Sequence, residues 1–317
     1  MTTQAYRYLF GPVPSRRLGL SLGVDLVPSK TCSLDCVYCE SGTTTHLTVK
    51  RGEWVPTEAV KEEISRYLLE HDAPDAVTFS GAGEPTLHTG IGDVARHIKK
   101  EAPGTRVVLL TNGTLFHMEA VRRDVLPVDL VVASYDAFDP DLFKVINRPH
   151  PSLNPQVMAE GLLTFREMYG GEFWLEFFVV PGVNDQEKEL ANIARVAKEL
   201  RPHRIQVNTL DRPGAEAWVK PADAEILKRV AGTLEAGEVI SSYEDSRKRL
   251  MVSDDVEAAI LGMIGRRPAT LADFVSSLGV NVDVLEEVLD QLLKKGCIVE
   301  ECQGRGRFYK LSNGPKD

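Results

Sequence analysis

Apolar and polar positions follow a repeating pattern along the first three quarters of the chain. Short runs rich in apolar and β-branched residues predict strands, and the longer segments between them repeat their apolar residues every three to four positions, as amphipathic helices do. The strands are predicted at residues 21–28, 76–79, 106–113, 129–136, 172–181 and 204–210. The helices are predicted at residues 57–70, 90–101, 118–124, 154–169 and 185–199, with Thr57 as the N-cap of the first. Apolar strands that alternate with helices are typical of a parallel sheet covered by helices.

Six strand and helix units in this order predict an α/β fold, a partial (β/α)6 TIM-like barrel, because right-handed crossovers curl such a sheet without closing it. A Gly- and Pro-rich strap at residues 10–19 precedes the first strand, and Pro12 and Pro14 exclude a regular helix there. We expect the strap and the barrel to form one domain, residues 1–245.

The pattern changes after Asp254 to three helical segments and a hairpin. The helices are predicted at residues 256–266, 270–278 and 282–295, and the hairpin strands at 297–301 and 308–311. Three helices and a glycine-turn hairpin resemble a winged helix, so residues 250–317 are predicted to form a small winged-helix-like domain. Its third helix carries four acidic residues that would repel a phosphate backbone, Asp283, Glu286, Glu287 and Asp290. Only the hairpin has the basic and aromatic residues typical of an RNA contact, Arg305, Arg307, Phe308, Tyr309 and Lys310.

Charge and hydropathy exclude some classes of protein. The 37 basic and 46 acidic residues give a net charge of −9, which argues against a general attraction to nucleic acid. No window approaches 18 uncharged apolar residues, so no membrane span is expected. The first eight residues have no apolar core of a signal peptide, and we therefore expect a cytoplasmic protein with reduced thiols.

Three of the five cysteines lie within eight residues, at Cys32, Cys36 and Cys39. Three thiolates on one loop can hold three irons of an iron–sulfur cluster and leave the fourth iron open. A structural zinc ion is the main alternative, but it needs four ligands, and His46 is the only nearby candidate for the fourth. An odd number of cysteines argues against a disulfide framework. The other two, Cys297 and Cys302, are read as unremarkable thiols.

Polar residues gather where the predicted strands end. The functional residues of parallel α/β sheets lie at the carboxyl ends of the strands, so residues there are expected to share one site. The cysteine loop follows the first strand, and the polar residues at the later strands are Glu84, Asn112, Ser134, Asp136 and Asn208. For Asp136 a helix cap before residues 139–140 is the alternative.

The spacing C-x3-C-x2-C, with Tyr38 before the last cysteine, resembles the signature of the radical S-adenosylmethionine (SAM) superfamily. The resemblance implies a partial six-fold barrel over about residues 10–240 and a [4Fe-4S] cluster on Cys32, Cys36 and Cys39. In that superfamily the open iron binds SAM, and an electron from the cluster cleaves SAM to a 5′-deoxyadenosyl radical. Gly81-Ala-Gly-Glu-Pro85 resembles the Gly-Gly-Glu-Pro motif, although Ala82 is an additional residue. The implied SAM contacts are Tyr38, Gly83, Glu84, Asn112, Ser134, Asp136, Val180 and Asn208.

Further phrases, such as Gly-Pro-Val-Pro-Ser-Arg-Arg-Leu-Gly and Ser-Gly-Ala-Gly-Glu-Pro-Thr-Leu, resemble Fe–S oxidoreductases that are grouped with tRNA wyosine-base synthases. Those synthases use additional N-terminal cysteines for a second cluster, and this sequence has none before Cys32. The resemblance therefore implies kinship, not the same reaction.

A substrate cavity is expected at the barrel mouth, above the adenosyl group. Its candidate lining residues are Arg16, Asn112, Asn147, Arg148, Glu176 and Asn208. Glu176 interrupts an apolar strand, so its carboxylate faces a cavity or pairs with a cation.

The sequence thus favours a radical SAM enzyme that receives electrons from a flavodoxin or ferredoxin. Its substrate is either a tRNA or nucleoside, or a peptide or protein. Residues 250–317 would either dock that substrate or cap the barrel mouth. The alternative from another class is a redox-sensing iron–sulfur regulator that binds DNA. The oligomeric state is not predicted.

Overall fold

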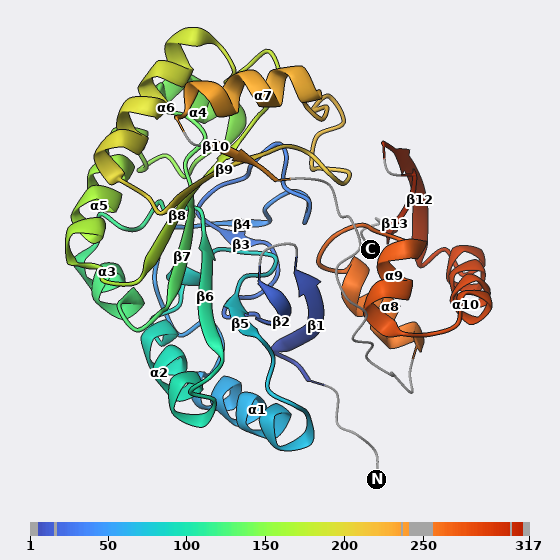
Figure 1. Cartoon of the computed structure of the whole chain (residues 1–317). Helices are drawn as coiled ribbons and strands as arrows, with labels where there is room; N and C mark the ends of the chain where they lie inside the picture. The colour runs from blue at the N-terminus through green and yellow to red at the C-terminus, as the bar shows by residue number, and fades with distance from the viewer. Residues whose placement is uncertain (1–5, 16–17, 236, 241–255, 305, 313–317) are drawn as a thin grey trace.

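The computed structural model describes residues 6–15, 18–235, 237–240, 256–304 and 306–312. Its central feature is an eight-stranded sheet whose six inner strands are parallel, as in a partial TIM barrel (Figure 1). The six inner strands are β2 (Gly19–Val24), β5 (Ala76–Phe79), β6 (Arg106–Thr111), β7 (Leu130–Ser134), β8 (Glu172–Phe178) and β9 (Arg204–Asn208). They are neighbours in chain order, which confirms the predicted α/β barrel fold.

Two edge strands extend this sheet. The strap that the sequence presents as irregular contains β1 (Leu9–Ser15), which pairs antiparallel with β2 through an irregular register. An edge strand tolerates proline because one side of it needs no donors. At the other edge, β10 (Gly237–Val239) runs parallel to β9. Arg16, proposed for the substrate cavity, lies outside the described residues.

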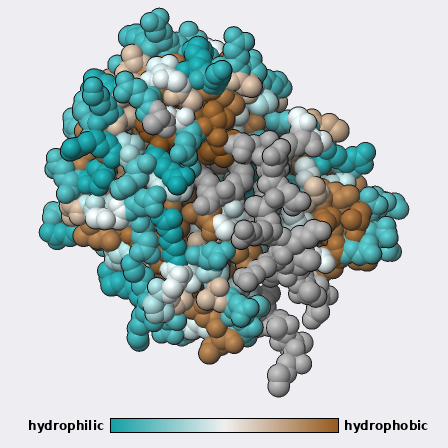
Figure 2. Space-filling view, viewed as in Figure 1, coloured by the Kyte–Doolittle hydropathy of each residue, from teal (hydrophilic) through white to brown (hydrophobic). Residues whose placement is uncertain are grey.

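Helices cover the outer face of the sheet and leave their outward side largely hydrophilic in the view of Figure 2. Five helices lie within three residues of their predicted bounds: α1 (Thr57–Glu70), α2 (Ile91–Glu101), α3 (Glu119–Val125), α5 (Pro155–Met168) and α6 (Glu187–Leu200). The elements without a counterpart in the prediction are α4 (Pro140–Ile146), α7 (Ala224–Thr233), the short pair β3 (Thr31–Cys32) and β4 (His46–Leu47), and the 3₁₀ turn η1 (Pro85–Leu87). The predicted cap of α1 is wrong by one residue, since Pro56 is the N-cap and the Thr57 N–H donates to Glu53 Oε1 at 2.8 Å.

The C-terminal part has its own apolar core. It consists of α8 (Val256–Ile264), β11 (Ala269–Thr270), α9 (Leu271–Leu278), α10 (Val282–Lys294), β12 (Ile298–Gln303) and β13 (Gly306–Leu311). The three strands form one sheet in the order β11-β13-β12, and Phe274, Leu289 and Ile298 lie among the buried residues. Residues 245–250, the predicted boundary, lie outside the described residues, and the winged-helix name stays a prediction.

The hairpin of this part does not offer the RNA-binding surface that its composition indicates. Phe308 and Tyr309, on opposite faces of β13, are 0% and 7% exposed, and Tyr309 packs in the C-terminal core. Arg307 pairs with Glu300 at 3.1 Å, and Lys310 pairs with a glutamate on the same neighbouring strand. Arg305 lies outside the described residues. The aromatic rings are therefore not available for stacking on bases.

The C-terminal part packs beside β1 and the cysteine loop (Figure 1). Arg212, in the loop after β9, donates to Asp273 Oδ2 at 2.7 Å and to Pro268 O at 2.8 Å. Arg266 donates to Asp25 Oδ2 at 2.7 Å, and its backbone oxygen accepts from Ser41 Oγ at 2.7 Å. These contacts fasten residues 266–273 to both ends of the segment that carries the cysteines. No helix in the described part of the chain is long and apolar enough to cross a membrane.

Candidate functional site

The loop that carries the cysteines is held between two other loops at the carboxyl end of the sheet. Thr31 forms a parallel bridge with Gly83, in the loop after β5. A Cβ atom on Gly83 would lie 2.4 Å from Thr31 O, so this approach requires glycine. On the other side, the Asp35 N–H donates to Asn147 O at 2.9 Å, at the end of α4. The cysteine loop is thus fixed to two segments that the sequence separates widely.

Cys32, Cys36 and Cys39 are free, partly buried thiols on this loop. Burial raises the pKa of Cys32 to about 12 and that of Cys36 well above its usual range. Neutral thiols are therefore favoured without a cation, whereas bound iron deprotonates them. His46, the alternative fourth zinc ligand, is exposed and packs on Trp54 with ring centroids 5.2 Å apart. In the described ranges, no three His, Cys, Asp or Glu side chains are grouped so that they could bind one metal ion such as zinc. An iron–sulfur cluster does not need such a group, because each cysteine binds a different iron.

Two asparagine amides donate to the cysteine sulfurs. Asn147 Nδ2 lies 3.3 Å from Cys36 Sγ, and Asn112 Nδ2 lies 3.5 Å from Cys32 Sγ. Asn112 follows β6, and its Oδ1 accepts from the Thr114 hydroxyl at 2.8 Å, which fixes the amide. Hydrogen bonds to ligand sulfurs influence the reduction potential of iron–sulfur clusters. Buried thiols with amide donors beside them fit the expected cluster.

Tyr38 is fixed by a ring stack and a buried carboxylate. Its ring lies 3.8 Å from that of Phe178 at an interplanar angle of 10°, and its hydroxyl donates to Asp136 Oδ2. Asp136 also accepts from Asn147 Nδ2 at 2.9 Å and from Phe178 N at 3.0 Å. Burial raises the pKa of Asp136 to about 6 in spite of these donors. Asp136 thus joins β7, β8, the end of α4 and the cysteine loop.

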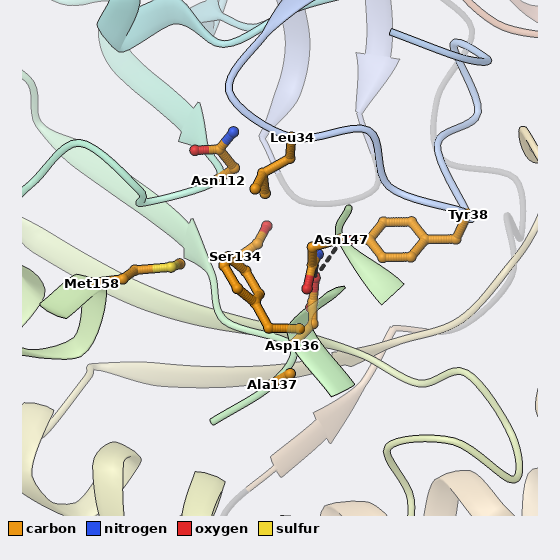
Figure 3. A pocket seen from close by; sticks show the side chains of 9 residues that line it. Leu34, Tyr38, Asn112, Ser134, Asp136, Ala137, Asn147 and Met158 are labelled. Atoms are coloured by element: carbon orange, nitrogen blue, oxygen red, sulfur yellow. Dashed lines mark hydrogen bonds between the residues drawn. The ribbon is translucent and has the colours of Figure 1, made fainter. Parts of the chain in front are cut away.

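A small cavity of about 10 Å³ opens beside this network (Figure 3). Figure 3 shows side chains from the cysteine loop, β7 and α5 converging on it, and the lining residues are Leu34, Tyr38, Asn112, Ser134, Asp136, Ala137, Phe143, Asn147 and Met158. A cavity of this size has room for about one water molecule, whereas ligand sites commonly enclose about 300–1,000 Å³, so a ligand would lie almost entirely outside it. Asn147 Oδ1 is buried and accepts no hydrogen bond within the described part of the chain. A buried acceptor next to the thiols fits a cofactor that brings its own donor.

Glu84 is held by the protein on both of its oxygens. Oε1 accepts from Thr86 N at 3.0 Å, Thr86 Oγ1 at 2.6 Å and Thr111 Oγ1 at 2.7 Å, while Oε2 accepts from Asn112 N at 2.8 Å. Burial raises its pKa. In this structure Glu84 ties the loop after β5 to the end of β6. Its predicted contact with the SAM amino group stays a prediction.

The other predicted site residues divide between the cavity and its surroundings. Ser134 lines the cavity, and Asp139, not Asp136, caps α4. Glu176, on β8, is the register partner of Ser134 on β7 and is not part of the cavity lining. Its negative charge contributes to the raised pKa of Asp136.

Three further predicted residues have protein partners outside the cavity lining. Arg148 is bound to Glu216 at 2.6 Å. Val180 N donates to Asn184 Oδ1 at 2.8 Å, and Asn208 Oδ1 accepts from the next backbone N–H at 2.9 Å. Their roles toward SAM or substrate stay predictions.

The sequence analysis missed five residues of the site, among them Ala137 and Phe143 in the cavity lining and three that are described next. Phe178 stacks on Tyr38, and Leu34 and Met158 line the cavity. All three are apolar residues whose sequence pattern is that of an ordinary core. Only the position of Phe178 at the carboxyl end of a strand could have drawn attention to it.

Replacing Tyr38 with phenylalanine should lower the free energy of unfolding of the cofactor-free protein by about 1–3 kcal/mol, because Asp136 loses a buried donor. Tyr6 is a matched control, since its hydroxyl donates to Glu70 Oε2 at 2.6 Å at the surface, and Tyr6→Phe should change the stability by less than about 0.5 kcal/mol. Denaturant titration measures both. Equal losses in the two variants would contradict the role given to Tyr38.

Comparisons with known proteins agree with this geometry. The model of the Radical SAM superfamily matches residues 26–209, more than half of the chain. GTPase Obg of Brachyspira hyodysenteriae is 32% identical over 297 residues, which cover 92% of this chain and 43% of that protein. A UPF0026 protein of Methanocaldococcus jannaschii is 30% identical over 315 residues, covering 95% of this chain and 92% of that protein. The chain thus spans less than half of the first relative and most of the second.

A solved structure shares the fold. A radical SAM methyltransferase from Sphaerobacter thermophilus superposes with a TM-score of 0.53 at 18% identity, over 69% of this chain and 65% of that one. At this identity the likeness concerns the fold alone. With the family match, the free cysteine triad and the parallel barrel taken together, the chain belongs to the radical SAM superfamily, is related to the UPF0026 proteins, and is an enzyme whose cofactors are a [4Fe-4S] cluster and SAM.

Proposed function

We propose that this protein reductively cleaves SAM at a cluster held by Cys32, Cys36 and Cys39 and uses the product for hydrogen abstraction from a substrate at the barrel mouth. The observation that carries the proposal is the group of three partly buried thiols with amide donors beside a cavity at the carboxyl end of the sheet. When bound, the cluster and SAM supply a 5′-deoxyadenosyl radical, and an external reductant, a flavodoxin or ferredoxin, supplies the electron. The oxygen sensitivity of such a cluster suits the cytoplasm.

The side chains around the thiols bind and orient the cofactors. The Tyr38 ring, backed by Phe178, offers an apolar face for a nucleobase, and Asp136 keeps that ring in place. The amides of Asn112 and Asn147 donate to two ligand sulfurs. Residues 266–273 are fastened to the loop through the hydrogen bond from Ser41 to Arg266 O. The protein thus contributes orientation, while the cofactors supply the difficult chemistry.

The surface of the C-terminal part favours a cap or a peptide contact over an RNA contact. Its hairpin aromatics are buried, the basic residues Arg307 and Lys310 are paired with glutamates, and α10 exposes acidic residues. A phosphate backbone gains little from such a surface. We therefore place a peptide or a small molecule ahead of tRNA as the substrate.

Anaerobic reconstitution with iron and sulfide, followed by SAM and dithionite, should yield 5′-deoxyadenosine and methionine in amounts that exceed the protein. Liquid chromatography with mass spectrometry measures both products. A redox-sensing DNA-binding regulator would bind a specific operator and form no 5′-deoxyadenosine. A fully loaded cluster without SAM cleavage would therefore refute the proposed enzyme.

A further inference from the structure

Lys30, two residues before the first cysteine, has a buried amino group without a partner. Its Nζ atom is shielded from solvent, and no acceptor within the described ranges takes a hydrogen bond from it. An amino group that loses water without gaining an acceptor is costly to bury. The site must therefore offer Nζ an acceptor that the protein alone does not supply.

The position of Nζ is next to the third cysteine. A Cβ atom on Gly42 would lie 3.4 Å from Lys30 Nζ, and the Gly42 N–H donates to Cys39 O at 2.9 Å, so the amino group lies over the turn that begins at Cys39. Burial lowers the pKa of Lys30, while charge on the Cys39 sulfur opposes that shift.

The backbone of Lys30 is strained, and it is held in place from both sides. Its φ angle of 64° lies in the left-handed region that favours glycine. The Lys30 N–H donates to Ala82 O at 2.5 Å, and Lys30 O accepts from the backbone of Thr45 and His46 at 3.1 and 3.0 Å. Glycine would adopt this backbone conformation with less strain. The geometry of the turn therefore does not explain why a lysine stands here, and its side chain must have another role.

We infer that Lys30 Nζ donates a hydrogen bond to the cluster at its Cys39 corner and raises the reduction potential of the cluster. The inference rests on the proposed ligation by the three cysteines. Asn112 and Asn147 donate to Cys32 and Cys36, whereas within the described ranges the Cys39 sulfur has a donor only in the Ser41 backbone and none in a side chain. With the cluster bound, Lys30 gives the Cys39 corner a side-chain donor, as Asn112 and Asn147 do for the other two corners. Such donors stabilise the reduced, more negative cluster.

The test compares Lys30→Gly and Lys30→Met with the wild-type protein and with Lys50→Met, which removes an exposed lysine from the segment after the loop. Lys30→Gly removes the donor while it relieves the backbone, so a fall in potential there cannot be ascribed to misfolding. Each reconstituted protein is titrated with dithionite at controlled potentials, and the signal of the reduced cluster is followed by electron paramagnetic resonance. This readout needs neither SAM cleavage nor a substrate.

Both Lys30 variants should keep the cluster and show a reduction equilibrium about tenfold less favourable, a fall of about 59 mV for one electron, whereas Lys50→Met should match the wild type. Loaded variants whose potentials equal that of the wild type would overturn the inference and leave the ligand assignment intact. Loss of the cluster in both variants would also overturn it, in favour of a role in assembly. A wild-type protein that assembles no cluster would refute the ligand assignment and this inference with it.

Discussion

Cys36→Ala should remove the cluster and SAM cleavage together. The loop provides three cysteine ligands, and the other two cysteines, Cys297 and Cys302, are exposed residues of the C-terminal part. Loss of a residue that only orients a ligand already costs about 10–100-fold in metal affinity, so loss of a ligand should cost more than about 100-fold. Iron and sulfide analysis measures the cluster, and 5′-deoxyadenosine formation measures the cleavage.

The matched control for this variant is Cys302→Ala. Cys302 is an exposed free thiol on the C-terminal hairpin, and its removal should change neither the iron content nor the cleavage rate. Far-ultraviolet circular dichroism should be the same for both variants, because Cys36 lies in a loop rather than in the sheet. Retention of the cluster and of cleavage in Cys36→Ala would refute the ligand assignment.

The six parallel strands were predictable because strands buried on both faces are nearly continuous apolar runs. The strand β5, Ala76–Phe79, is buried at all four positions, and its pattern is correspondingly plain. The edge strand β1 gave no such signal, since glycine and proline interrupt it and its pairing comes from β2. The helices α3 and α4 have seven residues each, fewer than two repeats of the helical pattern, and the sequence analysis found only α3, because a pattern this short separates a helix poorly from a loop.

The site was predictable as a place but not as a set of contacts. Parallel topology brings the strand ends together, so Asn112, Ser134 and Asp136 were expected beside the cysteine loop. Which atoms they meet depends on side-chain packing between distant segments. Glu84 is occupied by hydroxyl groups two and 27 residues away, and Asn147 approaches Cys36 only because α4 ends against the cysteine loop.

The C-terminal hairpin is a case in which the sequence pattern predicted a surface that the packing does not form. Basic and aromatic residues in alternation indicate an RNA surface only if the aromatic rings face solvent. In the structure β13 lies between β11 and β12, and Phe308 and Tyr309 are both buried. The sequence gives little sign of β11, which has two residues, Ala269–Thr270.

Arg212→Ala should lower the free energy of unfolding by about 3–5 kcal/mol and loosen the C-terminal part from the cysteine loop. Arg212 is 6% exposed and binds Asp273 with two nitrogens, at 2.7 and 3.2 Å, and the Pro268 carbonyl with one of them. Its Nε atom lies 3.7 Å from Glu40 Oε2, next to the last cysteine. Without the guanidinium group, the buried Asp273 carboxylate keeps its charge and loses its counter-ion. Denaturant titration of the cofactor-free protein measures the loss.

Two further variants separate the buried ion pair from a general effect of removing an arginine. Arg195 pairs with Glu199 at 3.3 Å on α6 and lies 4.8 Å from the centre of the Phe138 ring, and Arg195→Ala should cost no more than about 1.5 kcal/mol. The double variant Arg212→Ala with Asp273→Ala should be more stable than Arg212→Ala alone, because no unpaired charge then remains buried, although Thr270 loses the carboxylate that closes its capping box. An Arg212→Ala variant that loses no more free energy of unfolding than Arg195→Ala would contradict this role. The Arg212 guanidinium group would then be solvated, and its pair with Asp273 could not hold residues 266–273 in place.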